Sequence, residues 1–338
     1  MSSVVDEVSR PQKPGFGFFA RSTTWSLIGG LSVAAAWLMV AALTAFWPDK
    51  PESEWAYTGG FAAACAALAV VLVLAAFAGV RFTVFQRLQR LFPWLFALAL
   101  FLAAWELVTA KLGVLPLPFF PPPHAIVEVV IDDWRRVAEG VFASARLLAT
   151  GYFIGAAVGF VTGVAVGWSR LAGYWIHPVL RFIGPLPATA WLPLAFFVFP
   201  SSFSASIFLI ALATGFPVTV LTWSGVAGVK SAYYDIARTL GASQRFLVLK
   251  VAIPAAMPHV FVGLFMGLGN SFAVLVVAEM LGVKAGLGWY LQWAQGWAAY
   301  ANMYAALLLM AFLCSGLITL LFRLRDRLLA WQKGLVRW

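Results

Sequence analysis

The chain has 338 residues, of which 62% are hydrophobic and only 11% are charged, and its mean hydropathy is +0.89. No soluble domain of this size needs so much apolar surface, so the composition excludes a soluble protein and predicts an all-α protein that crosses a membrane several times. The net charge of +10 is compatible with nucleic-acid binding. The basic residues are dispersed among apolar runs and form no patch, however, so we expect no nucleic-acid partner.

Residues 1–24 are polar and are predicted to form a cytoplasmic tail. The apolar run that follows is too long for a cleavable signal peptide, so we expect it to be retained as the first span. About eight transmembrane helices are expected in all. They cover residues 25–47, 57–80, 91–111, 142–168, 182–199, 203–223, 259–281 and 303–322, and the fifth is broken by Pro185, Pro187 and Pro193.

A proline cluster follows the third span and cannot continue a helix. The residues after it, 125–139, carry apolar side chains on one side at helical spacing, which predicts an amphipathic helix lying at the membrane interface. These side chains are Ile126, Val129, Val130 and Trp134.

The distribution of positive charge predicts the orientation of the chain. If the N-terminus is cytoplasmic, 17 of the 23 Lys and Arg residues fall in inside segments, as the positive-inside rule requires. We therefore expect both termini in the cytoplasm, together with a basic tail over residues 324–338 and the polar segment 233–258.

Glycines recur at every fourth position of the fourth span. They form a groove along one side of the helix, which a neighbouring helix has to fill in lipid because small residues gain contacts there only by close packing. Packing within one chain is favoured over packing between subunits. The glycines are Gly151, Gly155, Gly159, Gly163 and Gly167.

The polar segment 233–258 begins with a pattern typical of a short amphipathic helix. Apolar residues stand at i, i+3, i+4 and i+7, a single stripe on a helix of about two turns. We expect Asp235 in the first turn, Gly241 in the left-handed conformation at the end, and Ser243 as the N-cap of the next helix. An apolar stripe that faces water predicts a docking surface, formed by Tyr233, Ile236, Ala237 and Leu240.

This order of residues resembles the EAA signature of ABC importer permeases, a cytoplasmic coupling helix that fits a cleft of an ATP-hydrolysing subunit. Asp235 stands where that family usually has Glu, and Ile236 where it usually has Ala. The resemblance implies a coupling helix over residues 233–241. It assigns contact with the ATPase to Tyr233, Asp235, Ile236, Ala237, Leu240, Gly241, Ala242, Ile253 and Pro254.

The resemblance extends from about residue 138 to 322 and looks like the nitrate, sulfonate and taurine branch. It implies a permease core at 138–323, preceded by a third span with its proline-rich segment at 91–137. The two-span segment at 25–90 has no counterpart in the six-span core. The loop at 199–203 lacks the charged residues usual in that branch, which weakens the inference about the solute.

The resemblance also implies an assembly in the bacterial inner membrane. A second copy of this permease would complete the assembly, and the two copies, a homodimer, would enclose a pathway for a small anion such as nitrate, a sulfonate or taurine. Two ATP-binding subunits would dock on the coupling helices, and an external solute-binding protein would deliver the anion.

Four residues are candidates for the pathway. Asn270 and Ser271 are polar residues in the middle of the seventh span, and Trp191 lies in the broken helix, whose free backbone groups can meet a solute. Glu279 is an ionisable residue inside a span and is by default a functional candidate. An equally good interpretation is that Glu279 is structural and is hydrogen-bonded to loop backbone.

Several chemistries are excluded or not expected. The sequence has no Gly-x-x-x-x-Gly-Lys-Ser/Thr phosphate loop, so the chain is not itself the ATPase, and we expect neither an enzyme activity nor a cofactor. The histidines, His124, His177 and His259, lack metal-like spacing and are expected at the membrane interface. Cys65 and Cys314 fall inside spans and are expected to be buried thiols.

Two other functions stay open. A secondary transporter that works without ATP would need charges inside the membrane, and only Glu106, Arg146 and Glu279 are available for that role. A membrane scaffold acting through the first two spans is compatible with transport.

Overall fold

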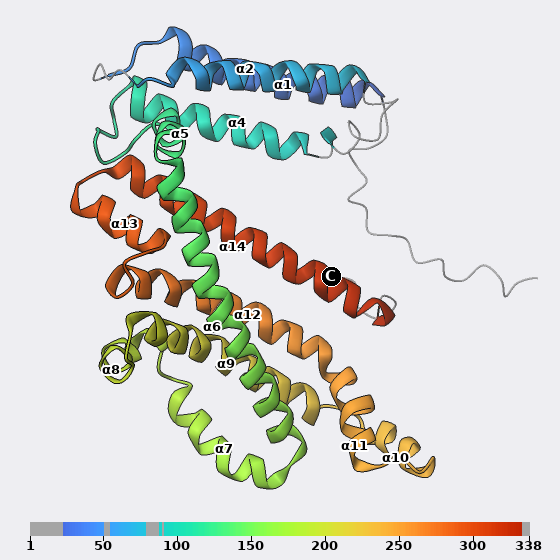
Figure 1. Ribbon diagram of the computed structural model, residues 1–338. Coiled ribbons are helices and arrows are strands. Elements are labelled where there is room, and N and C mark those ends of the chain that lie inside the picture. The colour runs from blue at the N-terminus through green and yellow to red at the C-terminus, as the bar shows by residue number, and fades with distance from the viewer. Residues whose placement is uncertain (1–22, 51–54, 79–87, 90, 333–338) are drawn as a thin grey trace, which may run out of the picture. The chain divides into compact units, whose positions relative to one another are not determined.

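The computed structural model describes residues 23–50, 55–78, 88–89 and 91–332, and every regular element within them is a helix (Figure 1). Seven helices are long and apolar enough to cross a membrane, and a pair of shorter helices bent by 87° would bring the number to eight. The chain divides into two compact units, one ending at Glu128 and the other beginning at Val129. The predicted all-α membrane fold is confirmed.

The N-terminal unit contains the first three spans. Helix α1 (Thr23–Phe46) packs against α2 (Thr58–Ala78) and α4 (Phe92–Glu106), and α4 continues into the π-helical turn η1 (Leu107–Lys111). Alanines without exposed surface line these contacts, among them Ala69, Ala75 and Ala99. Small side chains let helices approach closely in lipid, where dispersion contacts hold them together. The third span therefore belongs structurally with the two before it.

Four ionisable side chains, which we call the charged quartet, meet inside this unit. Lys111 Nζ lies 2.6 Å from Asp49 Oδ1 and 3.7 Å from Glu106 Oε1. His124 Nδ1 lies 3.2 Å from Glu106 Oε1, and His124 Nε2 lies 3.5 Å from Asp49 Oδ2. Lys111, Glu106 and His124 are buried. Two carboxylates enclose the His124 ring, and its expected position at the membrane interface stays a prediction.

The predicted interfacial helix over 125–139 is divided in the structure. Helix α5 (Pro123–Asp132) ends before Asp133, and α6 (Trp134–Trp168) includes the rest of the predicted segment and the fourth span. Asp133 Oδ2 accepts hydrogen bonds from the Tyr290 hydroxyl at 2.9 Å and from Asn302 Nδ2 at 3.1 Å. These partners come from far along the chain, so the local apolar pattern gave no sign of the break.

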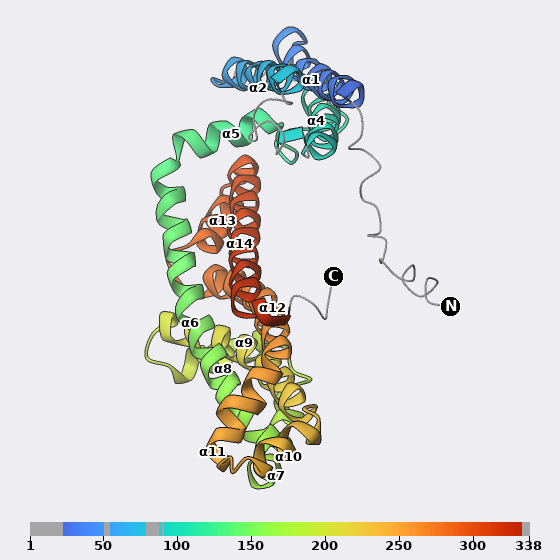
Figure 2. The same cartoon turned by 90° about the vertical axis from the view of Figure 1, so that its right-hand side faces the viewer.

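The C-terminal unit is organised around α9 (Ser202–Ala227), which lies between α6 and α12 (Ile253–Leu281) (Figures 1 and 2). The glycine stripe of α6 faces α9 of the same chain. A Cβ added at Gly155 would lie 2.4 Å from the Ala211 carbonyl oxygen, and one at Gly163 would lie 2.6 Å from Thr222 Cβ. Gly267 of α12 also contacts α9, because a Cβ added there would lie 3.1 Å from the Thr214 carbonyl oxygen. Glycine thus permits backbone contact on both sides of α9.

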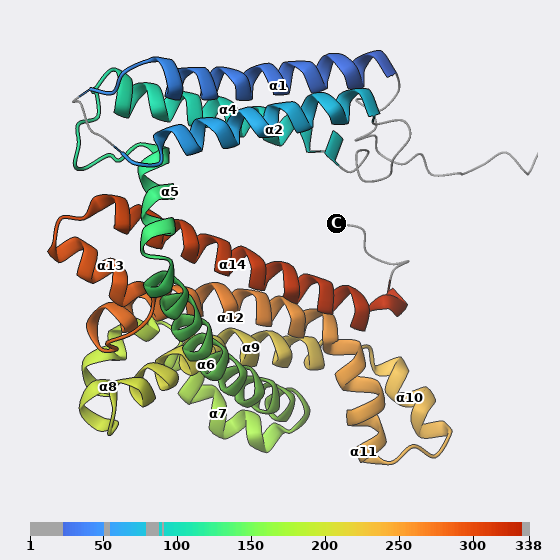
Figure 3. The same ribbon diagram turned by 45° about the horizontal axis from the view of Figure 1, so that its top comes forward.

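The remaining helices gather at the two ends of α9 and α12 (Figure 3). One end holds α8 (Leu192–Val198) and α13 (Leu287–Gly296), the latter not predicted from the sequence, and the other end holds α10 (Ser231–Thr239) and α11 (Gln244–Phe246). The turn η3 (Leu247–Ala252) joins α11 to α12, so the seventh span begins earlier than predicted.

Helix α14 (Tyr300–Leu328) extends beyond the predicted end of the eighth span, so the first residues of the predicted basic tail are helical, and η4 (Ala330–Gln332) follows. Of the predicted tails, residues 1–22 and 333–338 lie outside the described residues.

Candidate functional site

The predicted break in the fifth span occurs at Pro185 and Pro187, but the helix before it begins earlier than predicted, and Pro193 lies in the first turn of α8 without breaking it. Helix α7 (Arg170–Ile183) ends at a loop, and the short helix η2 (Ala188–Trp191) leads into α8 at an angle of 87° to α7. Pro185 and Pro187 lie in the loop, where they supply no backbone N–H to continue the helix. Gly184 allows the loop to pass close to α9, since a Cβ there would lie 2.6 Å from the ring of Phe216.

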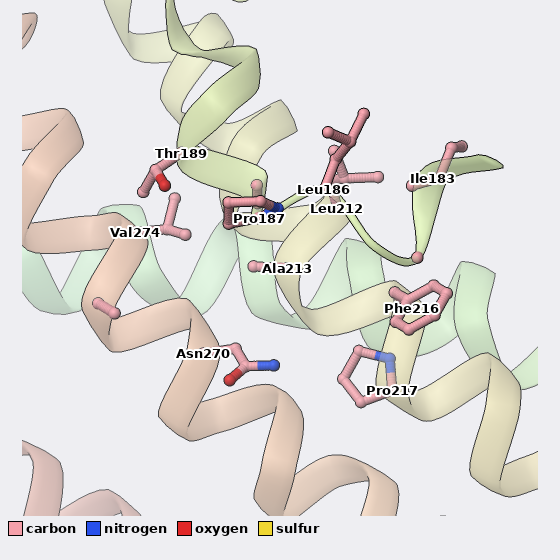
Figure 4. A pocket seen from close by; sticks show the side chains of 13 residues that line it. Ile183, Leu186, Pro187, Thr189, Leu212, Ala213, Phe216, Pro217, Asn270 and Val274 are labelled. Carbon is pink, nitrogen blue, oxygen red and sulfur yellow. The ribbon is translucent and has the colours of Figure 1, made fainter. Parts of the chain in front are cut away.

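This loop forms one wall of a pocket of about 330 Å³ (Figure 4). The second wall is α9, which contributes Phe216 and Pro217, and the third is α12, which contributes Asn270 and Val274. None of the 13 lining residues is ionisable, and the polar side chains among them are those of Thr189 and Asn270. The pocket therefore offers dipoles and no charge to a solute.

The Asn270 side chain points into this pocket (Figure 4) and makes no hydrogen bond within the part of the chain that the structure describes. Thr189 is half-buried and also has a free hydroxyl there. An unpartnered amide is costly in hydrocarbon, so Asn270 needs water or a polar solute beside it. The pathway role of Asn270 stays a prediction. Thr189 was missed by the sequence reasoning, although the proline-rich stretch around it marked the break.

The other three pathway candidates do not line this pocket. Ser271 is buried and donates to the Gly267 carbonyl, and its hydroxyl bonds with that of Thr214 across the α9–α12 contact. Trp191 is half-buried and packs against the hydrophobic core of the C-terminal unit. Glu279 is buried between α6 and α13, where it accepts hydrogen bonds. The pocket lining thus contains Asn270 and none of the other three candidates, and the hydrogen bonds of Glu279 favour its structural interpretation.

At the opposite end of the unit, α10 exposes an apolar stripe. The side chains of Tyr233, Ile236 and Leu240 are 55%, 61% and 83% exposed. Tyr234, on another side of the helix, packs edge-on against Trp168 at 5.7 Å between ring centroids and fixes α10 to the end of α6. Burial in this contact raises the pKa of Tyr234, an effect that nearby Arg238 partly offsets. The helix is therefore anchored on one side and open on the other.

The C-terminal end of α10 is followed by a sharp turn at Gly241. Gly241 has φ of +81°, the Ala242 N–H donates to the Ala237 carbonyl at 3.0 Å, and the Gly241 N–H donates to the Arg238 carbonyl at 2.9 Å. This pair of bonds is a Schellman motif, which needs a residue that tolerates positive φ. Ser243 then caps α11 by accepting the Phe246 N–H at 3.3 Å.

One expectation about α10 is wrong. Asp235 does not lie in the first turn, because the helix begins two residues earlier than predicted, at Ser231. Asp235 lies 3.4 Å from Arg238 Nη1 instead, in an exposed pair. Such pairs contribute little to stability, so Asp235 is free to contact another protein. Ile253 and Pro254 begin α12 and lie beyond the turn.

Comparison with known proteins identifies the family. The model of the family described as "Binding-protein-dependent transport system inner membrane component" matches residues 151–333. The chain belongs to this family. It is an ABC transporter permease, a multi-pass protein of the inner membrane, and the pocket and α10 both lie within the matched residues.

Similar permeases are known from several bacteria. The nitrate import permease protein NrtB of Synechococcus elongatus is 29% identical over 262 residues, covering 74% of this chain and 91% of the relative. A probable ABC transporter permease protein of Brucella abortus is 31% identical over 241 residues, covering 71% and 95%. The bicarbonate transport system permease protein CmpB of Synechococcus elongatus is 32% identical over 212 residues, covering 61% and 72%.

Proposed function

We propose that this permease carries a small anion through the pocket at Thr189 and Asn270, driven by separate ATPase subunits that dock on α10. Two permease chains form the pathway, two ATP-binding subunits attach on the cytoplasmic side, and an external solute-binding protein delivers the anion. Both chain termini face the cytoplasm. The chain itself binds no ATP and needs no cofactor.

The position of α10 carries this proposal. Along the chain, α10 follows α9 and precedes α11, η3 and α12. The two long helices α9 and α12 both line the pocket. Its exposed stripe of Tyr233, Ile236 and Leu240 has no cover within the described residues of the chain. A partner that binds this stripe and shifts α10 would displace α9 and α12, and with them two walls of the pocket. Binding and hydrolysis of ATP in the partner can thereby change access to the pocket.

The chemistry of the pocket supports a small anion that is held weakly. The two similar permeases whose solutes are named import nitrate and transport bicarbonate, both small oxyanions. The Asn270 amide and the Thr189 hydroxyl can donate hydrogen bonds to such oxygens. Since no lining residue is a cation, the anion meets dipoles only, and it leaves as readily as it enters.

The secondary-transporter alternative loses support from the same geometry. Glu106 is paired with Lys111 and His124, and Glu279 is hydrogen-bonded between helices, so neither faces the pocket. Arg146 lies over the Phe203 ring at 5.1 Å and is also absent from the pocket lining. No ionisable group of the described chain is therefore placed to carry a coupling ion beside the solute.

The test is uptake into liposomes by the full complex purified from its own membrane. We expect ATP-dependent uptake when nitrate, bicarbonate and an alkanesulfonate are each supplied with the solute-binding protein. Leu240→Glu places a charge on the exposed stripe and should lower both ATPase binding and uptake by more than tenfold. Ser231→Glu, on the other side of α10 and also exposed, is the matched control and should leave both near wild type. Uptake that persists without ATP or in Leu240→Glu would contradict the proposal.

A further inference from the structure

Glu279, near the end of α12, fastens three helices together. Its Oε2 accepts hydrogen bonds from Ser144 Oγ of α6 at 2.9 Å and from the Gly288 N–H of α13 at 2.8 Å. The Ser144 hydroxyl oxygen in turn accepts the Leu287 N–H at 2.8 Å. We call Glu279, Ser144 and the 286–288 backbone the latch. The Glu279 side chain is buried, so water cannot replace its hydrogen-bond partners, and breaking these hydrogen bonds is costly.

The backbone of the latch is shaped around the carboxyl group. Gly286 has φ of +111°, and a Cβ added there would lie 2.2 Å from Glu279 Oε1. A Cβ added at Gly288 would lie 2.8 Å from Glu279 Cβ. Both positions require glycine, one for its backbone conformation and both for space. The loop before α13 is thus fitted to a carboxyl group at this point, and its Gly288 N–H and the Ser144 hydroxyl of α6 both donate to Glu279 Oε2.

The same end of α12 supports the wall of the pocket. A Cβ added at Gly282, one turn beyond Glu279, would lie 2.2 Å from Cζ of Phe196 in α8. Phe196 of α8 therefore packs against the backbone at Gly282, the residue that follows α12. The short helix η2 precedes α8 without a break and places Thr189 in the pocket lining. Glu279 itself is absent from that lining. The latch is therefore connected to Thr189 along α12 to Gly282, across the contact of Gly282 with Phe196, and along α8 and η2.

We propose that Glu279 is a positioning residue. It holds the end of α12 against α6 and α13, and so keeps η2 and α8 in the place where they form the wall of the solute pocket. It acts as a hydrogen-bond acceptor and carries neither solute nor a proton. The transport readout below rests on the proposed function, whereas the labelling readout does not.

Two substitutions distinguish an acceptor from an ion carrier. Glu279→Gln keeps a carbonyl oxygen for Ser144 and Gly288 and is expected to retain uptake within about threefold of wild type. Glu279→Ala leaves both donors buried without an acceptor, and the maximal uptake rate should fall by at least about tenfold, with little change in the solute concentration for half-maximal rate. If Glu279→Gln is as damaging as Glu279→Ala, the carboxylate has a chemical role and the proposal is wrong.

A labelling experiment reads the position of the wall directly. In a complex whose chain has both native cysteines replaced, Thr189→Cys is labelled with a thiol reagent in the membrane. The labelling rate should rise several-fold in Glu279→Ala and less in Ser144→Ala, which removes only one of the two donors to Glu279. It should not rise in Glu279→Gln. Thr239→Cys, exposed on α10 at the other end of the unit, should be unaffected in all three.

The outcomes separate the two proposals. Unchanged labelling of Thr189→Cys in both Glu279→Ala and Ser144→Ala would overturn the positioning role, whatever happens to uptake. Altered labelling in a complex that imports none of the anions tested would support the latch and contradict the proposed function.

Discussion

The two units of this chain hold their central helices together by different contacts. The N-terminal unit encloses the charged quartet of Asp49, Glu106, Lys111 and His124, whose partners come from three segments. The C-terminal unit joins its central helices through glycine contacts and single hydroxyl bonds, such as those of Thr162 with Thr219 and of Thr214 with Ser271.

The two kinds of contact differ in the free energy that each contributes to holding the helices in place. Removing one partner of a buried ion pair costs about 3–5 kcal/mol, so the quartet fixes its segments in one arrangement. Hydrogen bonds between helices in a membrane average about 0.6 kcal/mol, and dispersion contacts between glycine faces are individually weak. A bundle that has to change shape around a solute is better built from such contacts. We therefore expect the N-terminal unit to resist rearrangement more than the central helices of the C-terminal unit do.

The largest expected effect comes from breaking the quartet. Lys111→Met leaves the buried carboxylate of Glu106 and the partly exposed carboxylate of Asp49 without their shared cation, and should destabilise the N-terminal unit by about 3–5 kcal/mol. Cys65 is 3% exposed in this unit, so its labelling by a thiol reagent reports the opening of that unit. Labelling of Cys65 should accelerate strongly, while that of Cys314, in the other unit, should change little.

Two further variants control this prediction. Lys50→Met removes an exposed lysine from the neighbouring connector and should have no measurable effect. Asp49→Asn combined with Lys111→Met removes one of the two carboxylates and should restore part of the loss. If Lys111→Met leaves Cys65 protected, the quartet does not fix the N-terminal unit and the comparison fails.

A smaller effect is expected from the glycine contacts. In Gly155→Ala, the new methyl group would lie 2.4 Å from the Ala211 carbonyl oxygen, so α6 and α9 have to separate. Such overpacking typically costs about 1–3 kcal/mol, which thermal unfolding of the purified complex can measure. Gly269→Ala on α12 meets no atom within 4 Å and is the matched control. A stabilised Gly155→Ala protein would show that this contact is loose.

The smallest effect is expected at Asn270, where stability is not at issue. Asn270→Ala removes one hydrogen-bond donor from the pocket and should lower anion uptake by about fivefold, since a single neutral hydrogen bond contributes about 1 kcal/mol. Asn270→Asp should lower it further through charge repulsion, with ATPase binding unchanged. The uptake assay described above measures both. Equal uptake by all three proteins would place the pathway elsewhere.

The sequence alone determined the features that depend on neighbouring residues in the chain. Apolar runs located the long membrane helices, the i, i+4 spacing located the glycine stripe of α6, and the residues around Gly241 predicted both a left-handed helix end and the Ser243 cap. Each follows from helical geometry or from the local demands of a turn, so no distant partner is needed to specify it.

Only the tertiary structure decided which of these residues meet. Asn270 and Ser271 are adjacent and equally polar, yet successive residues point about 100° apart on a helix, so one faces the pocket and the other faces α9. The break at Asp133, the quartet around Lys111 and the latch at Glu279 likewise depend on partners far away in the chain. Helical periodicity gives the faces of a helix, and only packing gives each face its neighbour.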